Sequence, residues 1–170
     1  MKVIETDRLI LRWLTTDDAA FILELLNDPS WLRFIGDRGM RTLEDARNYI
    51  LTGPMDMYSQ LGFGLYLTEL KDEGRTPIGI CGLIKRDSLE DVDLGFAFLS
   101  RFQTKGYGFE AASATLAYGS EQLGLKRIVA ITSEDNEGSS KLLEKIGMKF
   151  ERMIMVGDDT EELKLFGADF

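Results

Sequence analysis

The most informative segment of the chain is Leu99-Ser100-Arg101-Phe102-Gln103-Thr104-Lys105-Gly106-Tyr107-Gly108-Phe109-Glu110-Ala111. It leaves a strand-like segment, turns on two glycines and opens a helical pattern over residues 106–123. Helix openings expose amide groups that have no intrahelical partner, and glycine lets a ligand approach them closely. The stretch therefore predicts a phosphate-binding loop, to which Lys105 adds a charge. A simple tight turn is the alternative.

Two other phosphate-binding patterns fit less well. Residues 106–111 satisfy the dinucleotide pattern G-x-G-x-x-A. In that fold, however, the glycines follow their strand directly inside serial parallel units, whereas residues 100–105 intervene here. A Walker A loop is absent because neither glycine is followed by Lys and Ser or Thr. A dinucleotide-binding oxidoreductase stays as an alternative that would require parallel strands around Gly106.

Composition limits the class of protein. The 170 residues, 44% of them hydrophobic, suffice for one compact core, and we expect a single domain over 1–170. No run approaches the roughly 18 apolar residues of a membrane span, so we expect no membrane contact. Cys81 is the only cysteine and lies in an apolar run. This placement predicts a buried thiol and a cytoplasmic location.

The lack of histidine and the net charge of the chain exclude several functions. The chain contains 0 histidines, which excludes Ser-His-Asp catalysis and a His-rich zinc site, and we expect no metal. Carboxylates, hydroxyls and backbone groups must perform any chemistry. The net charge of −9 argues against nucleic-acid binding and slightly favours a cationic substrate.

The periodicity of apolar residues predicts a three-layer α+β fold. Its order, βααβββαβαββ, indicates a mixed, largely antiparallel twisted sheet of about seven strands flanked by helices. The expected strands are 3–12, 61–70, 76–84, 91–99, 127–132, 149–156 and 161–166, the last two joined by a turn at 157–160. The expected helices are 15–26, 42–53, 106–123 and 137–146.

These segments together resemble the GCN5-related N-acetyltransferase (GNAT) superfamily, and within it the branch of ribosomal-protein N-terminal alanine and serine acetyltransferases. Gln103-Thr104-Lys105-Gly106-Tyr107-Gly108 resembles the family's Q/R-x-x-G-x-G/A pyrophosphate motif, continued by Glu110-Ala111. Further matches are Glu5-Thr6-Asp7-Arg8-Leu9-Ile10-Leu11-Arg12, Ile78-Gly79-Ile80-Cys81-Gly82-Leu83, and Asn136-x-x-Ser139 followed by Leu143-Glu144-Lys145-Ile146-Gly147-Met148. The matches span nearly the whole chain in order.

The resemblance implies an N-acetyltransferase that moves an acetyl group directly from acetyl-CoA to a primary amine in a ternary complex. The amine would belong to a peptide or protein N-terminus or to a small molecule. The fourth and fifth strands would splay to admit the cofactor, and a backbone N–H there would stabilise the oxyanion. The implied cofactor-binding residues are Phe96, Ala97 and Phe98 for the pantetheine arm, Gln103, Thr104, Lys105, Gly106, Tyr107, Gly108 and Phe109 for the pyrophosphate, and Asn136.

Residues beyond the fifth strand are expected to serve the reaction. By the resemblance, the Asn136 amide binds the pantetheine, although an ordinary helix cap is the alternative. Ser139 looks like the hydroxyl that protonates the leaving thiolate, with a solvent-facing helix serine as the alternative. Many relatives use a tyrosine on this helix, but the aligned position is Leu143.

A carboxylate is expected to accept the proton of the amine. An α-amino group has a pKa of about 7.7–8.0, so a base or a water relay is useful at neutral pH. Asp93, at the start of the fourth strand, is the first candidate and Glu134 the second, and each has a solvated strand-end charge as the alternative. Glu110 lies in the first turn of a helix, where an acid complements the dipole, and we expect it to be structural.

The acceptor is expected to bind in the first third of the chain. Residues 31–36 fall between two helices in an expected loop, and loops carry specificity. Trp31 and Phe34 are the candidate substrate-binding residues. A catalytically silent acyl-CoA-binding module remains the alternative function, and a homodimer is possible.

Overall fold

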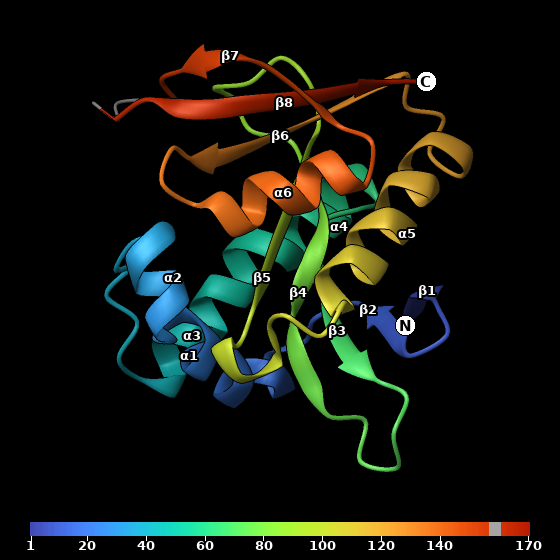
Figure 1. Cartoon of the computed structure of the whole chain (residues 1–170). Helices are drawn as coiled ribbons and strands as arrows, with labels where there is room; N and C mark the ends of the chain where they lie inside the picture. The colour runs from blue at the N-terminus through green and yellow to red at the C-terminus, as the bar shows by residue number, and fades with distance from the viewer. Residues whose placement is uncertain (157–160) are drawn as a thin grey trace.

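The computed structural model describes residues 1–156 and 161–170, so the predicted turn at 157–160 lies outside the described residues. Its described strands form one sheet of eight, in the order β1-β2-β3-β4-β5-β6-β8-β7 (Figure 1). The predicted α+β class is confirmed. The strands are β1 (Lys2–Glu5), β2 (Leu9–Arg12), β3 (Leu65–Leu70), β4 (Pro77–Ile84), β5 (Asp93–Phe98), β6 (Arg127–Ser133), β7 (Lys149–Ile154) and β8 (Leu163–Asp169). The α-helices are α1 (Ala19–Leu26), α2 (Pro29–Phe34), α3 (Leu43–Ile50), α4 (Asp56–Leu61), α5 (Tyr107–Glu121) and α6 (Glu137–Lys145).

The sheet separates two hydrophobic cores, because successive residues of a strand point to opposite faces. On one face Tyr66 and Cys81, which are partners across β3 and β4, pack with Ala112 of α5. On the other face the next pair, Leu67 and Ile80, packs with α1, α2 and α3. Figure 1 shows α5 and α6 together on one side of the central strands, apart from the group formed by α1, α2 and α3. The predicted burial of the Cys81 thiol is confirmed.

β5 and β6 diverge along their length. They pair in parallel at Asp93 and Val129, where the Val129 N–H donates to the carbonyl of Val92 at 3.0 Å. Beyond this point the two described strands run on to Phe98 and Ser133 without a further register pair. The predicted splay is therefore present, closed at Asp93 and open toward the carboxyl ends of both strands.

The expected single strand over 3–12 is wrong. It is a hairpin of β1 and β2, so the sheet has eight strands and not about seven. The turn between them is held by Thr6, whose N–H donates to the Leu9 carbonyl at 2.9 Å and whose hydroxyl accepts from the Leu9 N–H at 3.1 Å. Threonine side chains offer such local bonds in competition with a continuous strand.

The expected loop at 31–36 is also wrong over most of its length, because α2 occupies Pro29–Phe34. Asp28 caps this helix by accepting the N–H of Ser30 at 3.0 Å, and Pro29 takes the first helical position. Both residues are typical of helix starts, since Asp satisfies an orphan amide and proline has no amide to satisfy.

The expected helix over 42–53 begins correctly and ends too early. Thr42 and Asp45 form a capping box, but the chain stays helical past Pro54 through a π-type turn over Leu51–Met55 and on into α4. The wider turn accommodates a residue that lacks an N–H donor. The strand expected from residue 61 consequently begins at Leu65.

Among the described residues, no helix has the length and apolar character needed to cross a membrane.

Candidate active site

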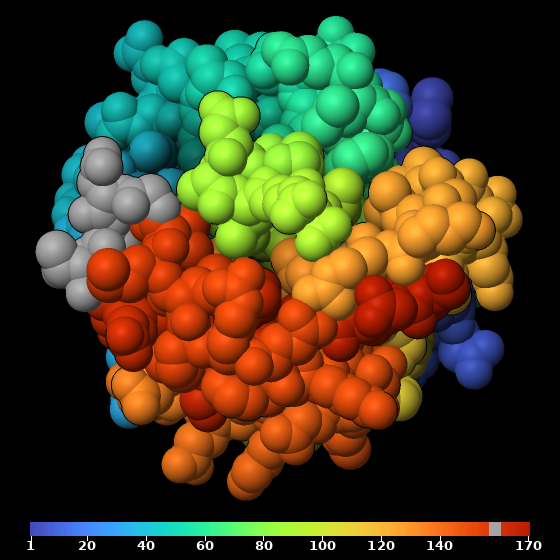
Figure 2. Space-filling view, turned by 90° about the horizontal axis from the view of Figure 1, so that it is seen from above, coloured from blue at the N-terminus to red at the C-terminus, as the bar shows by residue number. Residues whose placement is uncertain are grey.

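A cavity of about 670 Å³ occupies the splay between β5 and β6. Its walls come from β5, the loop that follows it, the start of α5, the end of β6, α6, and the α2 and α3 region. Seen from above, the segment just before β5 lies between the helices of the first third and the C-terminal strands (Figure 2). The cavity therefore joins the predicted cofactor loop to the predicted acceptor region.

The loop before α5 has an unusual backbone conformation. Gly106 has a φ of 85°, and Thr104 has a φ of 62°, which is uncommon for a residue with a Cβ. Such conformations often cluster at binding sites, where the surrounding structure holds them in place. The turn delivers the opening amides of α5 to the cavity, which Thr104, Gly106, Gly108 and Phe109 all line. A helix opening of this kind suits an anion.

An ion pair holds this loop against the N-terminal hairpin. Glu110 accepts hydrogen bonds from the Thr6 hydroxyl, from the Arg8 N–H at 2.9 Å and from Arg8 Nε at 2.8 Å. Arg8 Nη1 also donates to the Lys105 carbonyl at 3.2 Å, and its guanidinium lies 4.5 Å from the centre of the Tyr107 ring. These contacts give Glu110 a structural role, as expected. Sequence reasoning matched the segment containing Arg8 to the family without assigning this residue a role.

The backbone of β5 presents polar groups to the splay. The Leu99 N–H donates to the carbonyl of Ile78 at 2.9 Å, and β4 and β5 stay in regular register from there to Asp93. Since alternate residues of a strand direct their N–H and C=O to opposite neighbours, Leu94, Phe96 and Phe98 direct theirs away from β4. The side chain of Gln103 donates to the Phe98 carbonyl at 2.9 Å. An extended ligand could thus pair with β5 as a strand would.

The predicted cofactor residues do not all reach the cavity. Lys105 and Tyr107 do not line it, and Tyr107 instead packs under Arg8. The remaining members line it: Phe96, Ala97, Phe98, Gln103, Thr104, Gly106, Gly108, Phe109 and Asn136.

Asp93 is a buried carboxylate at the closed end of the splay. It is 1% exposed and lines the cavity. Arg86 Nε lies 3.3 Å from Oδ1 and 3.4 Å from Oδ2. Burial raises the pKa of Asp93 to about 6, and the Arg86 charge opposes this shift without cancelling it. Glu134 is exposed and does not line the cavity. The geometry therefore favours Asp93 over Glu134 as a base.

Ser139 and Asn136 lie together at the start of α6. Asn136 Oδ1 accepts the Ser139 N–H at 3.2 Å, so the helix-cap interpretation holds for this oxygen, and no hydrogen bond of the amide Nδ2 is found among residues 1–156 and 161–170. Both residues line the cavity, and Ser139 is partly exposed. Leu143, the position that the resemblance aligns with a tyrosine of many relatives, lines the cavity and is buried. The structure therefore places Ser139 at the cavity wall.

Both predicted substrate residues line the cavity, and so do three residues to which the sequence analysis gave no site role. Trp31 is 6% exposed and belongs to the core between α1, α2 and α3, while Phe34 is half-buried beneath the guanidinium of Arg33. Arg38, Tyr49 and Arg86 also line this cavity. Arg86 lies far from Arg38 and Tyr49 in the sequence, so no local motif linked the three residues.

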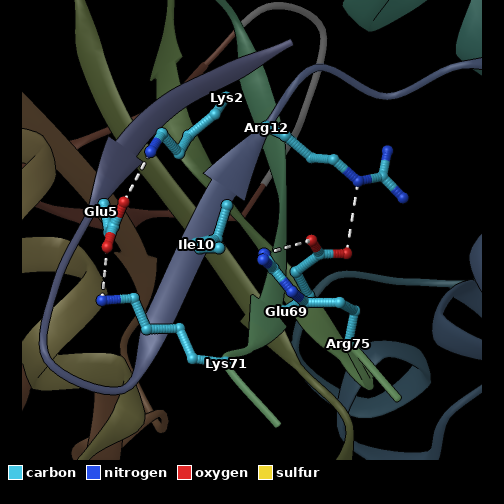
Figure 3. A pocket seen from close by; sticks show the side chains of 7 residues that line it. All are labelled: Lys2, Glu5, Ile10, Arg12, Glu69, Lys71 and Arg75. Carbon is cyan, nitrogen blue, oxygen red and sulfur yellow. Dashed lines mark hydrogen bonds and ion pairs between the residues drawn. The ribbon is translucent and has the colours of Figure 1, made fainter. Parts of the chain in front are cut away.

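A second cavity of about 440 Å³ lies on the outer strands β1, β2 and β3, away from this site (Figure 3). Its charged residues pair with one another. Glu5 contacts both Lys2 and Lys71 at 2.6 Å, and Glu69 contacts Arg12 at 3.3 Å and Arg75 at 3.7 Å. These pairs satisfy the charges that line this cavity and leave no catalytic arrangement there.

The sequence matches known proteins over most of its length. Residues 8–149 match the family described as Acetyltransferase (GNAT) domain. The chain is 30% identical over 154 residues to the uncharacterized N-acetyltransferase YoaA of Bacillus subtilis (strain 168), a match that covers 89% of this chain and 85% of that protein.

Solved structures share the fold. A GNAT-family acetyltransferase from Bacillus anthracis superposes with a TM-score of 0.80 at 26% identity, covering 99% of this chain and 98% of that one. RimL, a ribosomal L7/L12 α-N-protein acetyltransferase solved in complex with coenzyme A, gives 0.83 at 13% identity with the same coverage, a likeness of fold alone.

The splayed sheet and its cavity define the fold of the acyl-CoA N-acyltransferases. The chain belongs to the GNAT family of acetyltransferases and is an N-acetyltransferase. The resemblance drawn from the sequence motifs is thereby confirmed.

Proposed function

We propose that this protein transfers an acetyl group from acetyl-CoA directly to a primary amine in a ternary complex. The observation that carries the proposal is the junction of an open strand edge on β5 with the exposed amides that begin α5, both facing one cavity. Acetyl-CoA has parts that suit each of them, a peptide-like pantetheine arm and a pyrophosphate. Bound there, it would supply an activated thioester.

The residues of the cavity fit this cofactor. The backbone of Phe96 faces the splay and can pair with the pantetheine arm or donate its N–H to an oxyanion. Gly106 and Gly108 line the cavity and in the proposal offer their amides to the pyrophosphate, while Lys141 and Lys145 of α6 add positive charge to the cavity wall. Asn136 offers its Nδ2 to the same arm. The whole chain has a net charge of −9, whereas these two lysines make this part of the cavity wall positive.

Asp93 and Ser139 have complementary roles in the proposal. In the transfer a C–N bond forms, the thioester C–S bond breaks, and the amine loses one proton while the thiolate gains one. Asp93 accepts the proton of the amine. A general base is most effective when its pKa lies near the working pH, and burial raises the pKa of Asp93 to about 6. The hydroxyl of Ser139 protonates the thiolate. Trp31 and Phe34 would hold the acceptor at the far end.

Thiol release and calorimetry together test the proposal. Release of coenzyme A should require both acetyl-CoA and an amine, and coenzyme A alone should bind in a calorimetric titration. Release by the Asp93→Asn variant should fall while coenzyme A still binds, and Glu134→Gln serves as the matched carboxylate control. Tight coenzyme A binding without release from any amine would point to a silent acyl-CoA-binding module. Absence of coenzyme A binding would overturn the proposal altogether.

A further inference from the structure

The acceptor end of the cavity is positively charged. Arg38 and Arg86 line it beside Tyr49, with apolar walls from Trp31 and Phe34. Burial raises the pKa of the Tyr49 hydroxyl, and the charges of Arg38 and Arg86 both oppose this shift, which places two guanidinium groups within electrostatic reach of this phenol. Among the described lining residues, Asp93 is the one carboxylate, against the cations Arg38, Arg86, Lys141 and Lys145.

Arg86 has hydrogen-bonding capacity to spare. It contacts Asp93 through Nε alone, and within the described part of the chain no partner is recorded for its Nη1 and Nη2. Its side chain is 38% exposed, so a ligand in the cavity can reach these atoms. A guanidinium offers its nitrogens in a planar fork that binds a carboxylate through two parallel bonds.

We propose that the acceptor carries a carboxylate next to its amine, as an α-amino acid does, and that Arg86 and Arg38 recognise this carboxylate. This inference rests on the proposed function, in which the amine lies at Asp93. Asp93 and Arg86 are in direct contact at 3.3 Å, and the amine and carboxylate of an α-amino acid are likewise close, because one carbon atom joins them. One acceptor can therefore present its amine to Asp93 and its carboxylate to the free nitrogens of Arg86.

The remaining walls restrict the side chain of the acceptor. Leu25, Trp31, Phe34 and Ile35 supply apolar surface, which suits an aliphatic or aromatic amino acid. A polyamine would place additional positive charge beside Arg38 and Arg86, and like charges in a partly buried site repel one another. The cavity thus selects against the cationic acceptors that the overall charge of the chain would favour.

A pair of acceptors that differ only in the carboxylate tests the inference. Leucine and leucinamide have the same side chain, and leucinamide has the less basic amine, so without carboxylate recognition leucinamide should react at least as fast. We expect leucine to have a kcat/KM about tenfold to a hundredfold higher, the range for a hydrogen-bonded charge pair. Equal values, or a preference for leucinamide, for a peptide amide beginning with leucine, or for spermidine, would overturn the inference.

Variants of the two arginines test whether these residues recognise the carboxylate. Arg86→Gln and Arg38→Gln should each reduce the ratio of leucine to leucinamide, mainly through KM. The ratio is the informative quantity, because any change that Arg86→Gln causes in Asp93 affects both acceptors alike. Arg47→Gln is the matched control, since Arg47 is exposed on the same helix as Tyr49 and does not line the cavity. An unchanged ratio in both site variants would contradict the assignment.

A binding measurement separates this inference from the proposed function. N-acetylleucine and N-acetylleucinamide can be titrated into the protein saturated with coenzyme A, which requires no turnover. Tighter binding of the acid, lost in Arg86→Gln, supports carboxylate recognition. Equal binding overturns it even if acetyl transfer occurs. Coenzyme A binding without thiol release from any acceptor instead overturns the proposed function.

Discussion

Arg8 Nε lies 2.8 Å from Oε1 of Glu110, a residue 102 positions later in the chain. The same guanidinium donates to the Lys105 carbonyl at 3.2 Å and covers the ring of Tyr107. One side chain of the N-terminal hairpin thus bonds to both the loop and the first turn of α5. The opening amides of this helix are held in place before any ligand arrives.

Arg8→Gln should weaken coenzyme A binding without removing any group that faces the cavity. Losing the charge-assisted bonds to Glu110 frees the loop, and preorganisation of about 1 kcal/mol corresponds to roughly a fivefold loss of affinity. Calorimetric titration of coenzyme A measures this change. Arg75→Gln is the control, because Arg75 is exposed and pairs with Glu69 of β3. Equal affinities in a folded Arg8→Gln variant would show that the loop needs no such support.

Gly108→Val should weaken coenzyme A binding. A Cβ at this position would lie 2.7 Å from Leu142 Cδ1, so the Leu142 side chain or the start of α5 must shift, whereas the 3.6 Å to Phe98 Cε2 is an ordinary contact. The second substitution Leu142→Ala removes the closest of these atoms and should restore part of the affinity. Unchanged affinity in a folded Gly108→Val variant would refute the assignment of the pyrophosphate to this loop.

Turnover should rise with pH through a limb near pH 6. The pKa of Asp93 is raised to about 6, so this carboxylate is protonated and inactive as a base below that pH and charged above it. A pH profile of kcat/KM in Asp93→Asn should lack this limb and be much lower overall. Persistence of the limb in that variant would assign it to another group.

The same shift affects stability. A raised carboxyl pKa means that the native state binds more protons than the unfolded chain between about pH 4 and pH 6. The contribution of Asp93 to the free energy of unfolding is therefore greatest at low pH and declines as pH rises through 6. The free energy of unfolding, measured with urea across this range, should decline with rising pH in the wild type. The Asp93→Asn variant should lack this contribution to the pH dependence. Parallel pH dependences would indicate an unperturbed carboxyl group.

Ser139→Ala should lower kcat about a hundredfold to ten-thousandfold while leaving coenzyme A affinity nearly unchanged, a range that reflects loss of a general acid. The hydroxyl makes no recorded bond within the described protein, and the cap that Asn136 forms uses the Ser139 backbone. Ser120→Ala, on the exposed surface of α5, is the control. Equal rates in wild type and Ser139→Ala would remove this residue from the mechanism.

Much of the fold and many residues on the cofactor side of the cavity could be predicted from the sequence, because their signals are local. The capping boxes at Thr15 and Thr42 mark the predicted helix starts, and the glycines at 106 and 108 mark the loop. The prediction was wrong at a short turn and at the end of a helix, where individual residues acted differently from what the local pattern indicated. Thr6 closes a hairpin inside one apolar run, and a π-type turn carries the helix past Pro54.

Local signals in the sequence identified the GNAT family, the order of most strands and helices, and the residues of the loop before α5, since each depends on neighbours within a few positions. Tertiary structure alone decided which end of the cavity is charged and which carboxylate is buried. Arg38, Tyr49 and Arg86 meet only when α3, the segment after α2 and the end of β4 converge. Burial at the start of the splay then distinguishes Asp93 from Glu134, because the pKa of a carboxyl group depends on the solvent and charges around it.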